Sequence, residues 1–158
     1  MKKKFFLIAS LTILISGITN AETVQLKNFN ELFDALKNGK SVNAVIHYAK
    51  CKLVSDGEEL KSPDAIGGMN IQPFEYFSAG LFGSNKAFIS SSETVLIYLP
   101  RLGYVYNYVK LKIIEDNTVE ITARYLTADK FEVKMDETFF GEINDGSNDK
   151  GVYFFCGS

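Results

Sequence analysis

The segment Tyr104–Ile114, with the sequence YVYNYVKLKII, decides the fold because its side chains alternate along its whole length. Successive side chains of a β-strand point to opposite faces of a sheet. The segment therefore predicts a long strand with two distinct faces. One face carries Tyr104, Tyr106, Tyr108, Lys110 and Lys112, and the other carries Val105, Asn107, Val109, Leu111 and Ile113.

The sequence around this strand repeats the same pattern in shorter units. Pro100–Gly103 precedes it as a predicted turn, and Asp116-Asn117 follows it as another. Further β runs are predicted at residues 87–90, 94–99, 119–126, 131–136 and 152–156. Strands joined by short turns at nearly regular spacing indicate an antiparallel meander.

The only helix predicted lies near the start of the mature chain, over about residues 29–38. Its apolar residues fall at i, i+3, i+4 and i+7, which places them on one helical face. Asn28 can cap the first turn, with Glu31 three residues later as in a capping box. The four apolar residues are Phe29, Leu32, Phe33 and Leu36.

Residues 42–48, VNAVIHY, are rich in β-branched side chains and predict a strand after the helix. Residues 55–70 contain Asp-Gly, Pro-Asp and Gly-Gly pairs, which predict loop and turns. Within this range Asp56-Gly57 is a hairpin-type dipeptide between residues 52–54 and 58–60. The expected fold class is mainly β, of the α+β type. It consists of an N-terminal helix packed on a curved antiparallel sheet or a small barrel, comparable to a lipocalin only by analogy.

The first residues predict export. Lys2, Lys3 and Lys4 precede a mostly apolar run from Phe5 to Ile18, and Ala21 supplies a small residue for cleavage. This three-part pattern is typical of a secretory signal peptide. We expect residues 1–21 to be removed and residues 22–158 to form a single domain, in the periplasm or outside the cell.

The charge of the chain argues against two classes of partner. Its net charge is −2, and removal of three lysines with the signal peptide makes it −5. Without a basic stripe, binding to nucleic acid or to an anionic membrane surface has no electrostatic basis. No membrane span, cofactor or metal is predicted, and the partner is expected to be a protein or a small molecule.

Cys51 and Cys156 are the only cysteines. In an oxidising compartment they predict one disulfide, which would connect the end of the first long strand to the last strand. Two buried thiols, or one exposed reactive thiol, are the alternatives. A catalytic Cys–His pair could form only between Cys51 and His47, and it would also need an oriented base and an oxyanion site.

Tyr104, Tyr106 and Tyr108 are the candidate ligand-binding residues. Tyrosine combines apolar area with a hydrogen-bonding tip, which suits a binding surface. The alternative is a half-buried face packed under the helix or under a neighbouring strand.

Acidic residues supply weaker candidates. Acids gather near the C-terminus at Asp136, Glu137, Glu142, Asp145 and Asp149. Oxygen-rich loops can hold calcium, but the EF-hand spacing is absent and a solvated turn is the simpler interpretation. Glu75, Glu93 and Glu120 are possible glycosidase acids only in the sense that any two acids can meet in space.

The segment Asn28–Cys51, NFNELFDALKNGKSVNAVIHYAKC, resembles the opening of the VirK family, small exported proteins of bacterial pathogens and symbionts. The family pattern L-x-x-A-L-K-x-G-K corresponds to Leu32–Lys40, followed by a strand that ends near a cysteine. The resemblance continues through Ile66–Met69, Phe74–Phe77, Ala87-Phe88, Asn107–Lys110 and Gly151–Phe155. It implies export and a host-associated role, and it carries over no catalytic residues.

Together these patterns predict an exported VirK-like protein that binds a partner without catalysing a reaction. Two alternatives remain open at this point. One is a small secreted hydrolase, and the other is an assembly protein of the cell envelope or of a secretion system.

Overall fold

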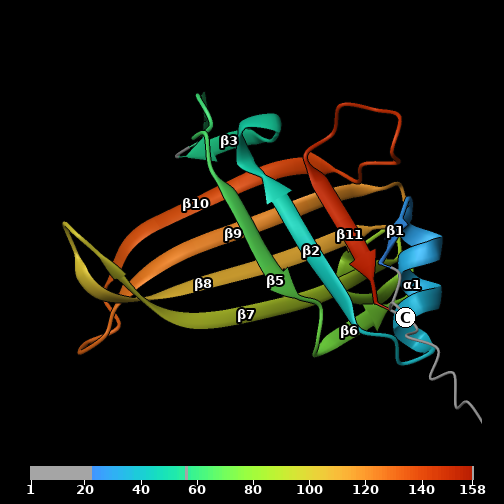
Figure 1. Ribbon diagram of the computed structural model, residues 1–158, viewed down its shortest axis with the longest axis horizontal. Helices are drawn as coiled ribbons and strands as arrows, with labels where there is room; N and C mark the ends of the chain where they lie inside the picture. The colour runs from blue at the N-terminus through green and yellow to red at the C-terminus, as the bar shows by residue number, and fades with distance from the viewer. Residues whose placement is uncertain (1–22, 56, 158) are drawn as a thin grey trace, which may run out of the picture.

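The structure is a computed structural model that describes residues 23–55 and 57–157. The predicted signal peptide, residues 1–21, lies outside the described residues. The described residues form one α-helix, two short 3₁₀ turns and two antiparallel sheets (Figure 1). The helices are α1 (Phe29–Lys37), η1 (Tyr48–Lys50) and η2 (Leu81–Gly83). The strands are β1 (Val24–Leu26), β2 (Val42–His47), β3 (Lys52–Ser55), β4 (Glu58–Leu60), β5 (Ile66–Asn70), β6 (Phe74–Phe77), β7 (Phe88–Leu99), β8 (Gly103–Ile114), β9 (Thr118–Thr127), β10 (Val133–Glu142) and β11 (Val152–Cys156).

The strands divide into a small sheet and a large sheet. The small sheet has the order β1-β11-β2-β5, and the large sheet has the order β4-β3-β10-β9-β8-β7-β6. Each order has two ends, so within the described residues neither sheet closes into a barrel. The predicted α+β class, with a helix on antiparallel sheets, is confirmed in its open-sheet form.

The small sheet and α1 lie on the same end of the large sheet. Figure 1 shows β11, β2 and β5 crossing over β7–β10, whose other ends continue to the left beyond β5. The core lies between the two layers. Its fully buried side chains include Leu32 of α1, Ile46 and Phe154 of the small sheet, and Leu111, Ile113 and Ile121 of the large sheet.

The helix begins as the sequence predicts. The Asn28 side chain accepts a hydrogen bond from the Glu31 N–H at 3.0 Å, and Glu31 in turn accepts one from the Lys27 N–H at 2.7 Å. A third contact comes from the β8–β9 turn. Asn117, which has a φ of 70°, accepts a hydrogen bond from the Phe29 N–H at 2.8 Å. Among the described residues no helix is long and apolar enough to span a membrane.

Two details of the expected secondary structure are corrected. The expected hairpin arms 52–54 and 58–60 pair as β3 and β4, but the rest of the expected loop contains β5, and the expected runs 87–90 and 94–99 belong to one continuous strand, β7. In β5 the pairing with β2 outweighs the turn preference of Gly67 and Gly68. Gly67 also makes room for an aromatic ring, because a Cβ there would lie 3.0 Å from Cε2 of Tyr48.

The expected disulfide is also corrected, because Cys51 and Cys156 are both free and buried. A Cβ on Gly151 would lie 3.1 Å from the Cys51 sulfur, so Cys51 sits just before the start of β11. Cys156 is the last residue of that strand, opposite Val42. At about 3.3 Å per residue, the strand between them separates the two thiols by roughly 16 Å. A disulfide requires Cα atoms within about 7 Å.

Burial makes Cys51 a pH-sensitive contributor to stability. It raises the pKa of the thiol from its ordinary 9.0 to about 11. The folded state therefore favours the neutral thiol, whereas the unfolded chain ionises it near pH 9. This contribution to stability is complete below pH 9 and is lost as the pH rises to about 11. We expect the melting temperature of the wild type to fall more steeply over this range than that of Cys51→Ala. Parallel curves for the two proteins would contradict the burial of this thiol.

The contact between Asn117 and α1 gives a second prediction. Asn117→Gly keeps the positive φ and removes only the side-chain acceptor, which should cost about 1 kcal/mol. Asn117→Ala also places an unsuited residue at positive φ, which should cost roughly 1 kcal/mol more. Thermal unfolding should therefore rank wild type above the glycine variant and the glycine variant above the alanine variant, in steps of a few degrees. A glycine variant as stable as the wild type would show that the bond to Phe29 contributes nothing.

Candidate binding surface

The end of the large sheet that the small sheet leaves uncovered carries a row of apolar side chains on its outer face. The register aligns Leu96 of β7, Tyr106 of β8 and Leu126 of β9 with Val133 of β10. Tyr98 and Tyr104 face each other one step further toward the β7–β8 turn. With Phe131 from the β9–β10 connection, these residues form what we call the aromatic surface: Leu96, Tyr98, Tyr104, Tyr106, Leu126, Phe131 and Val133.

The rings of the aromatic surface pack on one another and remain open to solvent. Tyr104 is 65% exposed, Tyr98 63% and Phe131 62%. The ring centroids of Tyr98 and Tyr104 lie 5.4 Å apart in an edge arrangement, and Tyr106 stacks on Phe131 at 5.4 Å. Neighbouring exposed apolar side chains of this kind are typical of interaction sites. The surface is thus preformed, because its rings already restrain each other.

The predicted tyrosines do not all belong to this surface. Tyr104 and Tyr106 are part of it, whereas Tyr108 lies in the next row, between Thr94 and Arg124. That row is polar, and Arg124 Nε donates to Asp136 Oδ1 at 2.9 Å. Alternation along β8 predicts that its tyrosines share one face. It cannot predict that Tyr98, Leu126 and Phe131 lie beside them, because that depends on how the neighbouring strands pair.

A hollow of about 210 Å³ lies between the two sheets, on the opposite, inner face of the large sheet. Its lining includes Tyr48, Asn107, Met135 and the β5 residues Ile66–Met69. The Tyr48 ring packs against Phe139, with centroids 4.7 Å apart. Burial is the main cause that raises the pKa of Tyr48 to about 12, with smaller contributions from Tyr125, Cys51 and Glu137. Tyr48 therefore stays protonated and can act only as a neutral hydrogen-bonding group.

The possible Cys–His pair is not assembled. The Cys51 thiol donates to the backbone carbonyl of His47 at 3.6 Å, and the His47 imidazole packs instead against Tyr153, with centroids 5.2 Å apart. Because burial raises the pKa of Cys51 to about 11, its thiolate is scarce at neutral pH. This geometry does not supply an activated nucleophile.

The candidate glycosidase acids are also apart. The register β6–β9 places Glu75, Ser90, Lys112 and Glu120 in one row, so Glu75 and Glu120 are three strand spacings apart. At about 4.8 Å per spacing this is roughly 14 Å, which exceeds the separations of about 5–9.5 Å used by glycosidases. Glu93 points to the inner face, where its carboxylate accepts a hydrogen bond from the Asn70 N–H at 3.3 Å.

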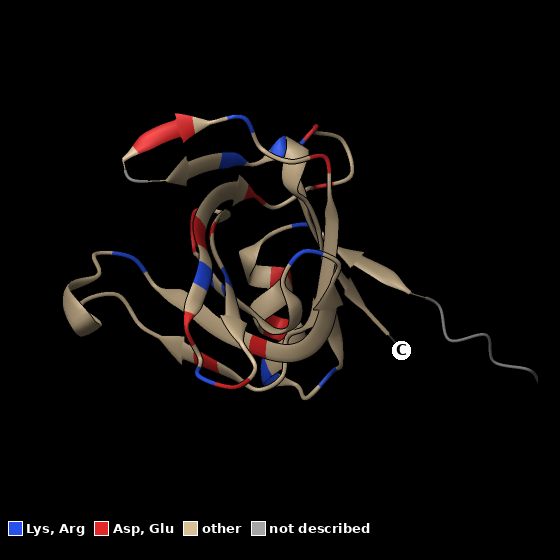
Figure 2. Cartoon of the chain, turned by 90° about the vertical axis from the view of Figure 1, so that its left-hand side faces the viewer, with Lys and Arg blue, Asp and Glu red and all other residues tan. Residues whose placement is uncertain are grey.

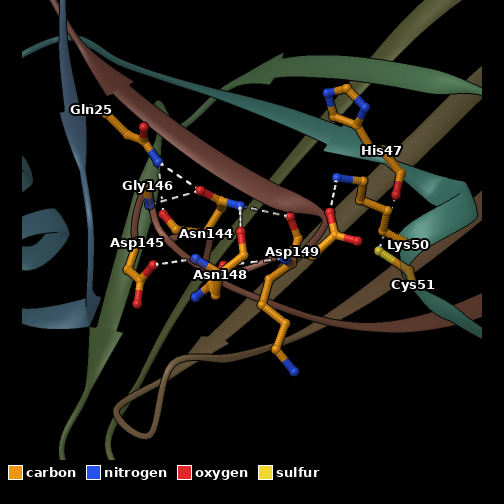
Figure 3. A network of polar contacts seen from close by, with 10 residues as sticks. Gln25, His47, Lys50, Cys51, Asn144, Asp145, Gly146, Asn148 and Asp149 are labelled. Carbon is orange, nitrogen blue, oxygen red and sulfur yellow. Dashed lines mark hydrogen bonds and ion pairs between the residues drawn. The ribbon is translucent and has the colours of Figure 1, made fainter.

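The acidic C-terminal loop is organised by an asparagine. Figure 3 shows Asn144, which is 3% exposed, at the centre of the connection between β10 and β11. Its side chain donates to the carbonyls of Asn148 at 2.9 Å and Lys150 at 3.0 Å, and it accepts from the Gly146 N–H at 2.8 Å. The Gln25 side chain of β1 donates to the Asn144 carbonyl at 2.8 Å.

The carboxylates of this loop are used within the protein. Asp145 accepts from the N–H groups of Ser147 and Asn148, and these bonds lower its pKa. Asp149 forms an ion pair with Lys50, and Glu142 forms one with Lys150. Within the part of the chain that the structure describes, no group of three or more His, Cys, Asp or Glu side chains could hold a metal ion. The solvated, internally bonded turn is therefore the interpretation that the geometry supports.

Charges are dispersed over the molecule. Figure 2 shows Lys and Arg residues interspersed with Asp and Glu residues along the strands and loops, and two adjacent acids form most of β4. The aromatic surface, in contrast, has neither sign of charge among its seven members.

Comparison with known proteins agrees with this fold. The family model described as VirK protein matches residues 25–131. Among solved structures, the chain is similar to the crystal structure of lpg1832, a VirK family protein from Legionella pneumophila. The TM-score is 0.63 at 19% sequence identity, over 84% of this chain and 98% of the other.

That solved structure supports the fold alone, because the two sequences have diverged far. No curated protein matches the chain. The family model, in contrast, spans α1 and every strand from β2 to β9. On this match, which extends over more than half of its residues, the chain belongs to the VirK family.

Proposed function

We propose that this VirK-family protein is exported and binds a partner protein through the aromatic surface, without catalysing a reaction. It acts in the periplasm or outside the cell. The observation that carries the proposal is the row of exposed, mutually packed aromatic side chains on the uncovered end of the large sheet. Export is supported by the signal-peptide pattern of residues 1–21.

Energetics favour a protein partner for this surface. Aromatic side chains bury large areas and lose little conformational freedom, so they are enriched among the residues that dominate binding energy. The neighbouring polar row, with Tyr108, Arg124 and Asp136, supplies hydrogen-bonding groups at the rim. An apolar centre with a polar rim is the usual anatomy of a protein interface.

The two alternatives receive less support. A secreted hydrolase needs two acids or a Cys–His pair in one cleft, and the named candidates lie apart. An assembly protein of the envelope or of a secretion system would use the same surface and would differ only in the identity of its partner. The experiment below therefore tests the surface first.

Replacement of aromatic side chains should separate binding from folding. Tyr98→Ser and Tyr104→Ser remove rings that are more than 60% exposed, so the melting temperature should change by no more than a degree or two. Binding to a partner cross-linked from the envelope or host-cell surface should weaken about 30-fold or more if either ring is a dominant contact. The dissociation constant can be measured by surface plasmon resonance.

Phe82→Ser is the matched control. Phe82 is 83% exposed but lies in η2, between β6 and β7, outside the aromatic surface. It should bind the partner as the wild type does. Equal weakening by all three variants would show general loss of surface hydrophobicity, and undiminished binding by Tyr98→Ser and Tyr104→Ser would refute this surface.

Export is tested by the intact mass of the protein from fractionated cells. We expect a periplasmic or extracellular species that begins at Glu22 and carries two free thiols, because the structure separates Cys51 from Cys156. After denaturation it should take up two alkylating labels without reductant. A cytoplasmic species that retains Met1 would contradict export.

A further inference from the structure

Strand β5 is an open edge of the small sheet. It pairs with β2 on one side and has no strand on the other within residues 23–55 and 57–157. The bonds from the Tyr48 N–H to Ala65 O at 3.0 Å and from the Ile71 N–H to Val42 O at 2.9 Å fix the register. In an antiparallel ladder alternate residues bond to the partner. Ile66, Gly68 and Asn70 therefore direct their backbone groups away from β2.

The side chain of Glu93 confirms this direction. Its carboxylate, from β7, accepts a hydrogen bond from the outward N–H of Asn70 at 3.3 Å. Among the described residues nothing accepts from the outward N–H groups of Ile66 and Gly68. Unpaired donors and acceptors at an edge form a template for another strand.

The space beside this edge is a hollow, and the inner face of the large sheet forms its floor. The hollow of about 210 Å³ is lined by Ile66 and Gly68 of β5 and by Asn107, Tyr125 and Met135 of the large sheet. Figure 1 shows β8, β9 and β10 passing behind β5 and continuing beyond its free edge. Gly68 adds no side chain at the edge, so a second backbone can approach it closely.

The floor limits what can occupy the edge. If two copies joined through β5 about a two-fold axis, their small sheets would become continuous and both large sheets would lie on the same side. The projecting ends of β7–β10 would then compete for the same space. A single extended segment brings no second large sheet with it. It can therefore lie beside the β5 edge and over the floor.

The floor also selects the chemistry of that segment. Val95, Ile97 and Tyr125 share the inner face of the projecting strands, so every second guest side chain would meet largely apolar surface. The inner positions of β7–β10 also include Glu93 and Glu137, and no Lys or Arg. This favours a guest with a basic residue.

We infer that the β5 edge is a second binding site, separate from the aromatic surface, that takes an extended, basic segment of another protein as an added strand. Backbone hydrogen bonds to Ile66 and Gly68 supply general affinity. The floor formed by the inner face of β7–β10 supplies selectivity through alternate side chains. This is strand addition, in which the main chain gives affinity and side-chain pockets give specificity.

The test uses a displayed library of random peptides of about eight residues, long enough to span a strand of ordinary length. Selected peptides should be enriched in Lys or Arg and in alternating apolar residues. Binding should slow hydrogen exchange of the Ile66 and Gly68 amides, while the Gly67 and Met69 amides, already bonded to β2, should change little. Methylation of alternate peptide nitrogens should abolish binding.

Gly68→Pro removes the outward donor and leaves the bonds to β2 in place, so peptide binding should weaken about tenfold or more. Gly68→Ala keeps the donor and is the matched control. Its Cβ would lie 3.4 Å from the Ala44 carbonyl oxygen. Since a proline can also disturb β5, Val95→Lys on the 41%-exposed floor provides a second variant that should weaken basic peptides equally.

Three results would overturn the inference: a library that yields no peptide, peptides that bind Gly68→Pro and Val95→Lys like the wild type, or exchange changes confined to β7–β10 without Ile66 and Gly68. Peptides lost only in Tyr98→Ser and Tyr104→Ser would also overturn it, and would at the same time support the aromatic surface. Failure at the aromatic surface leaves the β5 result unaffected, so the two proposals are separable.

Discussion

The structure depends on a mismatch in size between its two layers. Strands β7 and β8 have 12 residues each, and β9 and β10 have 10 each. At about 3.3 Å per residue the longest strands extend for roughly 40 Å. The small sheet has four strands of three to six residues, so it measures about 20 Å in either direction. It can therefore cover only about half of the length of the large sheet, and the hydrophobic core ends at the margin of the small sheet.

The covering sheet is fixed by close contacts at its margin. A Cβ on Gly141 would lie 2.9 Å from the Cys51 sulfur and 2.8 Å from Val152 Cγ2, so only glycine fits where β10 passes beneath β11. The side chain of Asn144 then bonds the β10–β11 loop to itself, and Gln25 ties that loop to β1. These contacts place the C-terminal strand inside the small sheet, next to β1 and β2. They explain how the last strand of the chain comes to pair with the first.

Sequence patterns predicted the elements that are stabilised mainly by residues close together in the sequence. The helix at Phe29–Lys37 follows from its apolar spacing and from the cap at Asn28, and β8 follows from the alternation between Tyr104 and Ile114. Properties that depend on the register between strands could not be predicted from the sequence. Spacing in the sequence cannot tell that Cys51 and Cys156 lie at opposite ends of one strand. It also cannot tell that Gly67 and Gly68 extend against β2 rather than turn.

The candidate site shows the same division. Alternation along β8 identified Tyr104 and Tyr106 as neighbours on one face, and the structure places them in the aromatic surface with Tyr98 and Phe131. It could not separate Tyr108, whose row becomes polar only through Thr94 and Arg124 on adjacent strands. Cross-strand neighbours determine the character of a sheet surface, and they are set by the register of the whole meander.

The large sheet extends beyond β5, and the apolar residues on this projecting end indicate a role for it. Where the small sheet covers the inner face, the outer face mixes polar and apolar side chains, as in the row of Ser90, Lys112, Glu120 and the exposed Phe140. At the projecting end the outer face is more uniformly apolar. Leu96, Tyr106, Leu126 and Val133 form one row, and Tyr98, Tyr104 and Phe131 are exposed beside it.

Folding alone gives no reason for this exposed apolar row, since polar side chains at these outer positions would lower the risk of aggregation at no cost to the core. The same holds for β5, whose open edge contains neither the proline nor the lysine with which proteins usually block strand addition. The exposed aromatic surface and the open β5 edge both favour aggregation, and their presence is consistent with surfaces that a partner covers. The short covering sheet thus has a direct consequence, because its β5 edge stays open over the inner face at the same end of the large sheet whose outer face carries the aromatic surface.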